Sequence, residues 1–175
     1  MKITMFLRHM LIMEESVSNN KKNYDSVLNE YRIHDEEKIE NDKLNYWKEI
    51  ESLGWYWLTK KWINNNPNDE LASILVEKYN LNEIVELHNF VVTHRIKLQS
   101  FLQVYYKSSP KEFKKQVKLS DDGLWDFSSH MVGLGEVMFN YVLDHPDSIL
   151  ELQKDYTENF EYGFDKAIYQ IQNKG

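Results

Sequence analysis

The chain has 175 residues, a formal net charge of −7, no cysteine, and only 3 proline and 6 glycine residues. Its length suits one domain, and the lack of cysteine excludes disulfide frameworks and thiolate metal sites. The negative charge argues against generic nucleic-acid binding, which needs clustered lysine and arginine, and it favours a cationic partner. We therefore expect a protein of a reducing compartment, which we take to be the cytoplasm.

The N-terminal extension, residues 1–43, is mostly polar and charged. Its opening stretch lacks the run of about 18 apolar residues that spans a bilayer, and no small-residue cleavage site follows. We expect neither a membrane segment nor a signal peptide, and Met13 is an alternative start to Met1. A thin apolar stripe over residues 17–31 allows one helix, so the extension is predicted to be helical or irregular.

Strong helical periodicity begins near residue 44 and predicts a first core helix over residues 42–64. The segment "NNNPND" ends this helix, because the residue before proline disfavours the α region. Asp69 is then expected to cap a short helix. Asn80 separates that helix from the longest one, residues 81–106, whose apolar side chains recur at steps of three, four or seven.

Residues 107–118, "KSSPKEFKKQVK", are predicted to form a loop or short connector. The five lysines of this region are Lys107, Lys111, Lys114, Lys115 and Lys118. A solvated loop is the simplest interpretation, and docking to an acidic partner or RNA is the alternative.

The segment from Ser120 to residue 144 is predicted to be one helix. Ser120 and the acids after it suit a helix N-terminus, where side-chain oxygens accept orphan N–H groups. Gly133 and Gly135 then lie mid-helix, where close helix–helix packing explains them. "DHPDS" ends this helix at Asp144 or His145, and a last helix carries apolar residues from 156 to 171.

These elements predict an all-α protein: a single-domain bundle of five or six helices over residues 44–175, preceded by the extension 1–43. Within the longest helix, His94 falls inside the apolar stripe and is expected to be a satisfied core histidine. His88 and Arg95 flank that stripe and are expected to pair with acids on a neighbouring helix.

Asp122, Asp126 and His130 are spaced by four residues, which aligns two carboxylates and an imidazole along one helical ridge. This pattern suits a divalent ion and suggests a metal-dependent hydrolase or small-molecule-binding enzyme. The helical angles, however, place His130 at the edge of the apolar stripe and Asp122 on nearly the opposite face. We therefore expect no metal or other cofactor and keep the enzyme as the alternative function.

"GWYWLTKKW", residues 54–62, concentrates three tryptophans and a tyrosine. Consecutive aromatic residues point all round a helix, so they either bury against the N-terminal extension or form an exposed binding hot spot. The predicted partner surface comprises Asp122, Trp125, Asp126, His130, Trp55 and Trp62.

The segment "SDDGLWDFSSHMVGLGEVMFNYVLDHPDS" resembles the signature of a bacterial family, the domain of unknown function 4240. The matching positions are Ser120, Asp121, Asp122, Gly123, Phe127, Gly133, Gly135, Phe139, Leu143, Pro146, Asp147 and Ser148. An early aromatic helix matches at Tyr46, Trp47, Ile50 and Glu51, whereas Ser128 and His130 stand where the family has Arg and Trp. The resemblance implies a small helical bacterial domain and brings no catalytic residues.

No His-Glu-x-x-His motif, Gly-x-Ser-x-Gly elbow or Walker lysine loop occurs in the sequence. Together with the acidic charge and the aromatic surplus, this predicts a non-catalytic protein-binding or accessory module. An immunity-type protein that neutralises a basic partner by electrostatic complementarity fits this class. The sequence leaves the identity of the partner and the oligomeric state open.

Overall fold

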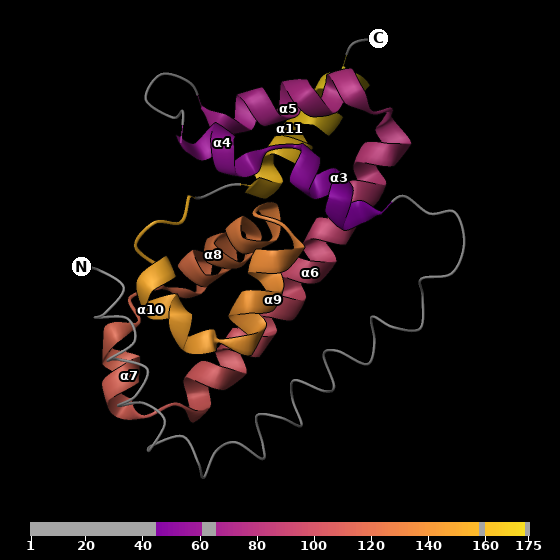
Figure 1. Cartoon of the computed structure of the whole chain (residues 1–175). Coiled ribbons are helices and arrows are strands. Elements are labelled where there is room, and N and C mark those ends of the chain that lie inside the picture. Colours follow the sequence, from indigo (N-terminus) through magenta and orange to yellow (C-terminus); the bar gives the residue numbers. More distant parts are fainter. Residues whose placement is uncertain (1–44, 61–65, 158–159, 174–175) are drawn as a thin grey trace, which may run out of the picture. The chain divides into compact units, whose positions relative to one another are not determined.

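The computed structural model describes residues 45–60, 66–157 and 160–173. The chain divides after Asn41, and every described residue belongs to the unit Asp42–Gly175. The described residues form helices and no strand, which confirms the all-α prediction (Figure 1). In chain order the elements are α3 (Tyr46–Ser52), α4 (Trp55–Lys60), α5 (Pro67–Lys78), α6 (Leu81–Ser108), α7 (Lys111–Gln116), α8 (Asp121–Gly133), α9 (Glu136–Asp144), the 3₁₀ helix η1 (Pro146–Ser148), α10 (Ile149–Leu152) and α11 (Phe160–Gln172).

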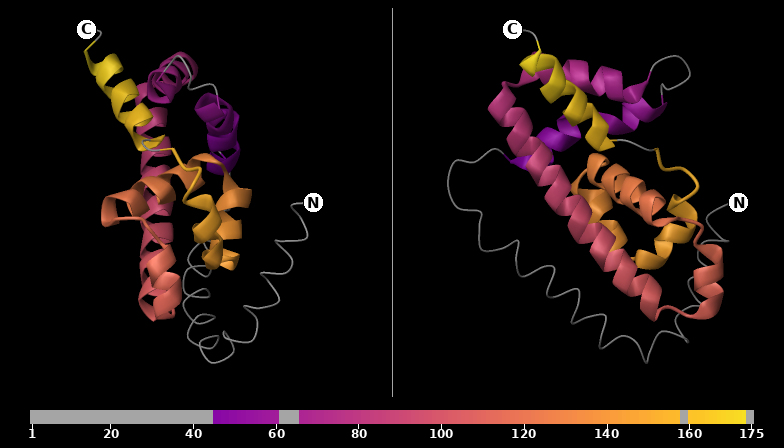
Figure 2. Two further views of the ribbon diagram at one scale, coloured as in Figure 1. Left: turned by 90° about the vertical axis from the view of Figure 1, so that its left-hand side faces the viewer. Right: turned by 180° about the vertical axis from the view of Figure 1, so that it is seen from behind.

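Helix α6 organises the described unit because it contacts α3, α8, α9 and α11. The right panel of Figure 2 shows α6 crossing the unit with α8 and α11 beside it. Helix α11 also packs extensively against α5. Six large aromatic side chains from α4, α6, α8, α9 and α11 are almost completely buried: Trp55, Phe101, Phe127, Phe139, Phe160 and Phe164. Burying each contributes about 1.5–3 kcal/mol, so they dominate the core.

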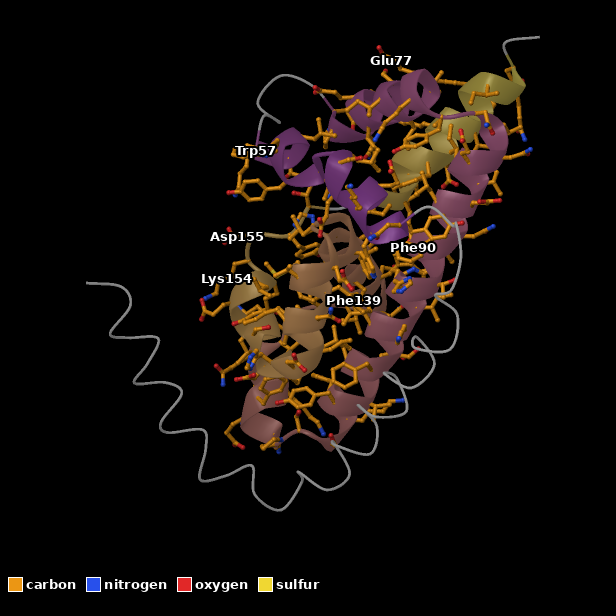
Figure 3. All side chains as sticks on the ribbon, turned by 45° about the vertical axis from the view of Figure 1, so that its right-hand side comes forward. Trp57, Glu77, Phe90, Phe139, Lys154 and Asp155 are labelled. Atoms are coloured by element: carbon orange, nitrogen blue, oxygen red, sulfur yellow. The ribbon has the colours of Figure 1, made fainter. Side chains whose placement is uncertain are left out.

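An aromatic cluster joins α3, α6 and α9. The Trp47 ring lies 5.0 Å from Phe90 and 5.2 Å from Phe139, two residues labelled in Figure 3. His94 packs in the same cluster, 4.8 Å from Trp47, and its Nδ1 donates to the Phe90 carbonyl at 2.9 Å. His94 is therefore the satisfied core histidine that its place in the apolar stripe predicted.

The predicted core helix 42–64 is wrong, because two shorter helices, α3 and α4, occupy its described part. Gly54 separates them with φ +67°, a left-handed conformation that costs glycine little. The sequence pattern placed Gly54 inside one continuous helix and missed its role as a helix terminator. Residues 61–65, including Trp62, lie outside the described residues.

The next helix boundaries follow local capping chemistry. Helix α5 begins at Pro67 with Asn66 as its N-cap, three residues before the predicted cap at Asp69. Helix α6 begins as predicted after Asn80, whose side chain accepts from the backbone of Glu83 while Glu83 reaches back to the Asn80 N–H. This reciprocal capping box supports the start of the longest described helix.

Two further expectations needed correction. The predicted connector 107–118 contains a helix, α7, whose Phe113 is buried. The predicted helix from Ser120 to residue 144 is two helices, because Gly135 adopts φ +100° between α8 and α9. Ser120 does cap α8, accepting from the Gly123 N–H at 3.0 Å, and α9 ends at Asp144 as expected.

Gly135 also makes room for a carboxylate from α3. The Glu51 side chain accepts from the Glu136 N–H at 3.3 Å, at the start of α9. A Cβ at position 135 would lie 2.6 Å from Glu51 Cγ, which is closer than packing allows.

None of the described helices has the length and apolar character needed to cross a membrane.

Gly133→Ala should destabilise the protein by about 1–3 kcal/mol, because overpacking forces neighbouring core groups to move. The added Cβ would lie 2.7 Å from Trp55 Cδ1 and 2.9 Å from Phe160 Cγ. Gly123→Ala is the matched control, since its nearest neighbour would be Ser120 Oγ at 3.3 Å and alanine favours helix. Urea unfolding of both variants measures the difference, and equal stabilities would contradict this account of Gly133.

Candidate functional site

The predicted ridge of Asp122, Asp126 and His130 is divided between surface and core. Asp122 is exposed, Asp126 is half-buried and His130 is buried. In the described ranges, no three histidine or acidic side chains are grouped closely enough to hold a metal ion. The three side chains therefore do not form a shared site, although their spacing along the helix is regular.

His130 serves the core through a bond to Trp55. The Trp55 indole Nε1 donates to His130 Nδ1 at 3.0 Å, and the Thr157 backbone N–H approaches the same nitrogen at 3.3 Å. Nδ1 must then be unprotonated. Burial, together with the nearby positive charge of Lys60, lowers the pKa of His130 to about 4, so this imidazole is neutral at pH 7.

Trp55 is only 1% exposed, which overturns its place in the predicted partner surface. Its ring lies 5.0 Å from Phe160 and fits against α8 because Gly133 carries no side chain there. His130 is removed from the partner surface by the same contact. The sequence pattern could not show this, because positions 55, 130 and 160 meet only in the folded chain.

The free energy of unfolding should fall as the pH decreases from about 6.5 towards 4. In the unfolded state His130 takes up a proton near pH 6.5, whereas in the folded state it stays neutral until the pH approaches its lowered pKa of about 4. The loss over this window is on the order of 3 kcal/mol. His130→Gln keeps an acceptor for Trp55 without titrating, so urea unfolding across this range should show a shallower pH slope. Identical slopes would contradict the neutral, buried assignment.

Arg95 and Glu161 form a buried ion pair between α6 and α11. Arg95 Nε donates to Glu161 Oε1 at 2.9 Å, and Nη1 donates to Gln99 at 3.1 Å. One helical heptad earlier, His88 Nε2 lies 3.8 Å from Asp165 Oδ1. Both flanking residues thus meet acids of a neighbouring helix, as predicted.

Trp125 covers the same guanidinium from the α8 side. Its ring centroid lies 3.7 Å from Arg95 Cζ, yet the Trp125 side chain remains 45% exposed. Such a stacked cation is worth about 0.5–2 kcal/mol and favours the stacked orientation of the indole. Among the described members of the predicted partner surface, Trp125 is therefore the exposed aromatic residue, and its contact with the buried Arg95 holds it in place.

Glu161→Leu should cost about 3–5 kcal/mol, because it leaves the Arg95 charge buried and unpaired. The double variant Arg95→Met with Glu161→Leu should recover most of that loss, since apolar side chains then fill the space. Lys154→Met is a surface control: its pair with Glu151 is exposed and worth less than about 1 kcal/mol. Thermal or urea unfolding measures the stability of all three variants. A double variant no more stable than Glu161→Leu would contradict the assignment of a buried ion pair.

The three helices that meet at this ion pair also carry exposed apolar side chains. We define the Trp125 face as Trp125 of α8, Val85 and Ile96 of α6, and Tyr162 and Tyr169 of α11. Ile96 follows Arg95 and Tyr162 follows Glu161, so their backbones are tied together by the 2.9 Å ion pair. Tyr169 lies two helical turns beyond Tyr162 on the same side of α11. The right panel of Figure 2 shows these three helices together.

Sequence reasoning missed four members of this face. Tyr162 and Tyr169 are spaced by seven residues, a signal that marks one side of a helix. That spacing could have separated them from the core residues Phe160 and Phe164. Nothing in the sequence pairs α11 with Arg95, so the face itself needed the fold.

A second exposed aromatic group lies on α4. Trp57 is 67% exposed and packs edge-on against Tyr56, with ring centroids 5.1 Å apart (Figure 3). Lys60 approaches the Tyr56 ring at 5.6 Å. This group follows from the aromatic surplus of residues 54–62, but within the described ranges it has no buried cation beside it like the one that holds Trp125.

A pocket of about 600 Å³ lies where the C-terminal end of α6 meets α7, the start of α8 and α10. Aromatic side chains Tyr105, Tyr106 and Phe113 line it, together with Ser120 and Asp121. Burial raises the pKa of Tyr105, and the negative charge of Asp147 raises it further. The pocket therefore brings together Ser120 and Asp121 from one end of the segment 120–148 and Ile149, which directly follows its other end.

Comparison with known proteins finds one match to a family. The sequence model of the family described as "Protein of unknown function (DUF4240)" matches residues 41–174. No curated protein and no solved structure gives a significant match.

Proposed function

The chain belongs to the DUF4240 family, and we propose that it is a non-catalytic protein-binding module that docks a basic partner on its Trp125 face. The finer proposal is an accessory role of immunity type in a bacterial cytoplasm. In such a role the domain would neutralise its partner by covering a positively charged surface.

The observation that carries this proposal is the combination of exposure and fixation at Trp125. The indole is 45% exposed and stacked on a guanidinium that Glu161 holds in the core. An aromatic side chain that is already ordered loses little conformational entropy on binding. Tryptophan, tyrosine and arginine are also the residues enriched at binding hot spots.

The charge around the face supports a basic partner. Helices α8 and α11 together contain five acidic side chains and one lysine, Lys166. Asp122 on α8 and Asp165 on α11 are both exposed. Acids beside an apolar centre give a polar rim, which steers a cationic surface towards the face and fixes its orientation.

The alternative function, a metal-dependent hydrolase or small-molecule-binding enzyme, has less support. It requires Asp122, Asp126 and His130 to act at one site, whereas His130 directs Nδ1 at Trp55 in the core. No observation within the described residues favours hydrolysis at these side chains.

Trp125→Ala should weaken partner binding by about 10–100-fold, because truncating a hot-spot tryptophan costs about 2 kcal/mol or more. The measurement is capture of partners from a lysate of the source cells on immobilised wild-type chain, followed by titration of the purified partner. Trp57→Ala is the matched control, since Trp57 is more exposed and lies on α4.

Binding that Trp57→Ala preserves, that Trp125→Ala loses and that salt weakens would support the proposal. Equal loss in both variants would point to general stickiness of exposed tryptophan. A captured partner whose affinity ignores both Trp125 and salt would contradict it, as would the absence of any partner at low salt.

A further inference from the structure

The pocket at the end of α6 has the size and lining of a small-molecule site. Its volume of about 600 Å³ falls within the range of ligand pockets. Helices α6, α7, α8 and α10 all contribute to its walls, so it is formed by the fold and not by one loop. The lower part of Figure 1 shows the end of α6 turning into α7 close to α10.

Most of the lining favours an apolar, flat ligand. Tyr105 and Phe113 meet edge to face with ring centroids 5.5 Å apart, which holds both rings in fixed orientations. Tyr106, Leu124 and Ile149 extend this apolar wall. An aromatic ring entering the pocket would gain both apolar burial and ring–ring contacts.

The charges of the lining specify the polar end of the ligand. Among the twelve lining residues, Lys107 and Asp121 are the two that carry full charges, one of each sign. Both side chains are exposed and can reach a ligand without burying an unpaired charge.

Several other charged side chains near the pocket have contacts of their own. The Lys114 ammonium donates to the Lys107 carbonyl at 2.7 Å and lies 6.0 Å from the Tyr106 ring centroid. Lys115 pairs with Glu112, and Glu151 pairs with Lys154. The negative charge of Asp147 contributes to the raised pKa of Tyr105, after burial. A ligand with one positive and one negative group matches the balance that Lys107 and Asp121 present.

We propose that this pocket binds a free α-amino acid with an aromatic side chain. The ring lies against Tyr105, Tyr106 and Phe113, the ammonium faces Asp121 and the carboxylate faces Lys107. This site is independent of the Trp125 face, so either proposal stands or fails without the other.

The test is a ¹H–¹⁵N correlation titration of the full-length chain with three probes: L-phenylalanine, phenethylamine and 3-phenylpropanoate. L-phenylalanine should bind with Kd on the order of 1 mM, given typical ligand efficiencies for a molecule of its size. Its shifts should concentrate on residues around Tyr105, Phe113 and Asp121. Each analogue lacks one charged group and should bind about tenfold more weakly.

Substitutions supply the matched controls. Asp121→Asn should weaken L-phenylalanine and phenethylamine about tenfold while sparing 3-phenylpropanoate, and Lys107→Met should show the opposite selectivity. Asp122→Asn and Lys111→Met alter neighbouring charges that do not line the pocket, and they should bind like the wild type. Unchanged spectra outside the pocket confirm that each variant is folded.

Absence of saturable shifts with L-phenylalanine would overturn the proposal. Equal affinity for all three probes would also overturn it, since that indicates apolar adsorption alone. Equal affinity for L-phenylalanine and one analogue would show that the pocket recognises only one of the two charged groups. The proposal of an amino-acid site would then be rejected in favour of an aromatic amine or an aromatic carboxylate.

Discussion

The structure depends most on one buried cation. Arg95 lies at the point where α6, α8 and α11 meet, bonded to Glu161 and covered by Trp125. A lone guanidinium in such a place would be strongly destabilising, so the carboxylate from α11 must be present whenever α6 and α8 are packed. The ion pair therefore fixes the position of α11, and α11 in turn provides the main packing surface of α5.

The same interaction links stability to recognition. Trp125 is ordered by a charge in the core while much of its ring stays in water. A residue with these properties can serve a partner without adding a flexible element to the surface. The proposed face thus needs no special loop, since packing that holds three helices together also presents the aromatic side chains.

Sequence patterns predicted the parts of the fold that are encoded locally. Apolar periodicity identified α6, and short-range signals identified the Ser120 cap and the Asn80 boundary. The sequence patterns failed at Gly54 and Gly135, because an amphipathic pattern does not indicate whether a glycine within it has a positive φ. They also joined helices that these glycines separate and took α7 for a connector, so the predicted number of helices is smaller than the number in the described residues.

The candidate site was less predictable because its contacts span long stretches of sequence. Arg95 was recognised as needing an acid, but Glu161 could not be chosen from the several acids available. Trp55 and His130 were assigned to the surface from their own helices alone, whereas each is buried by the other. Helical angles describe one helix at a time and cannot show which second helix covers it.

The burial of Trp55 has a consequence for how the chain is made. Helices α3 and α4 have 7 and 6 residues, far below the length at which an isolated helix is stable in water. The rings that enclose Trp55 belong to His130 and Phe160, so they emerge from the ribosome well after it. Synthesis must therefore reach the final helix before Trp55 gains its complete set of core contacts. Until then the Trp55 indole lacks these core partners, and apolar surface of this kind on a nascent chain promotes chaperone binding or aggregation.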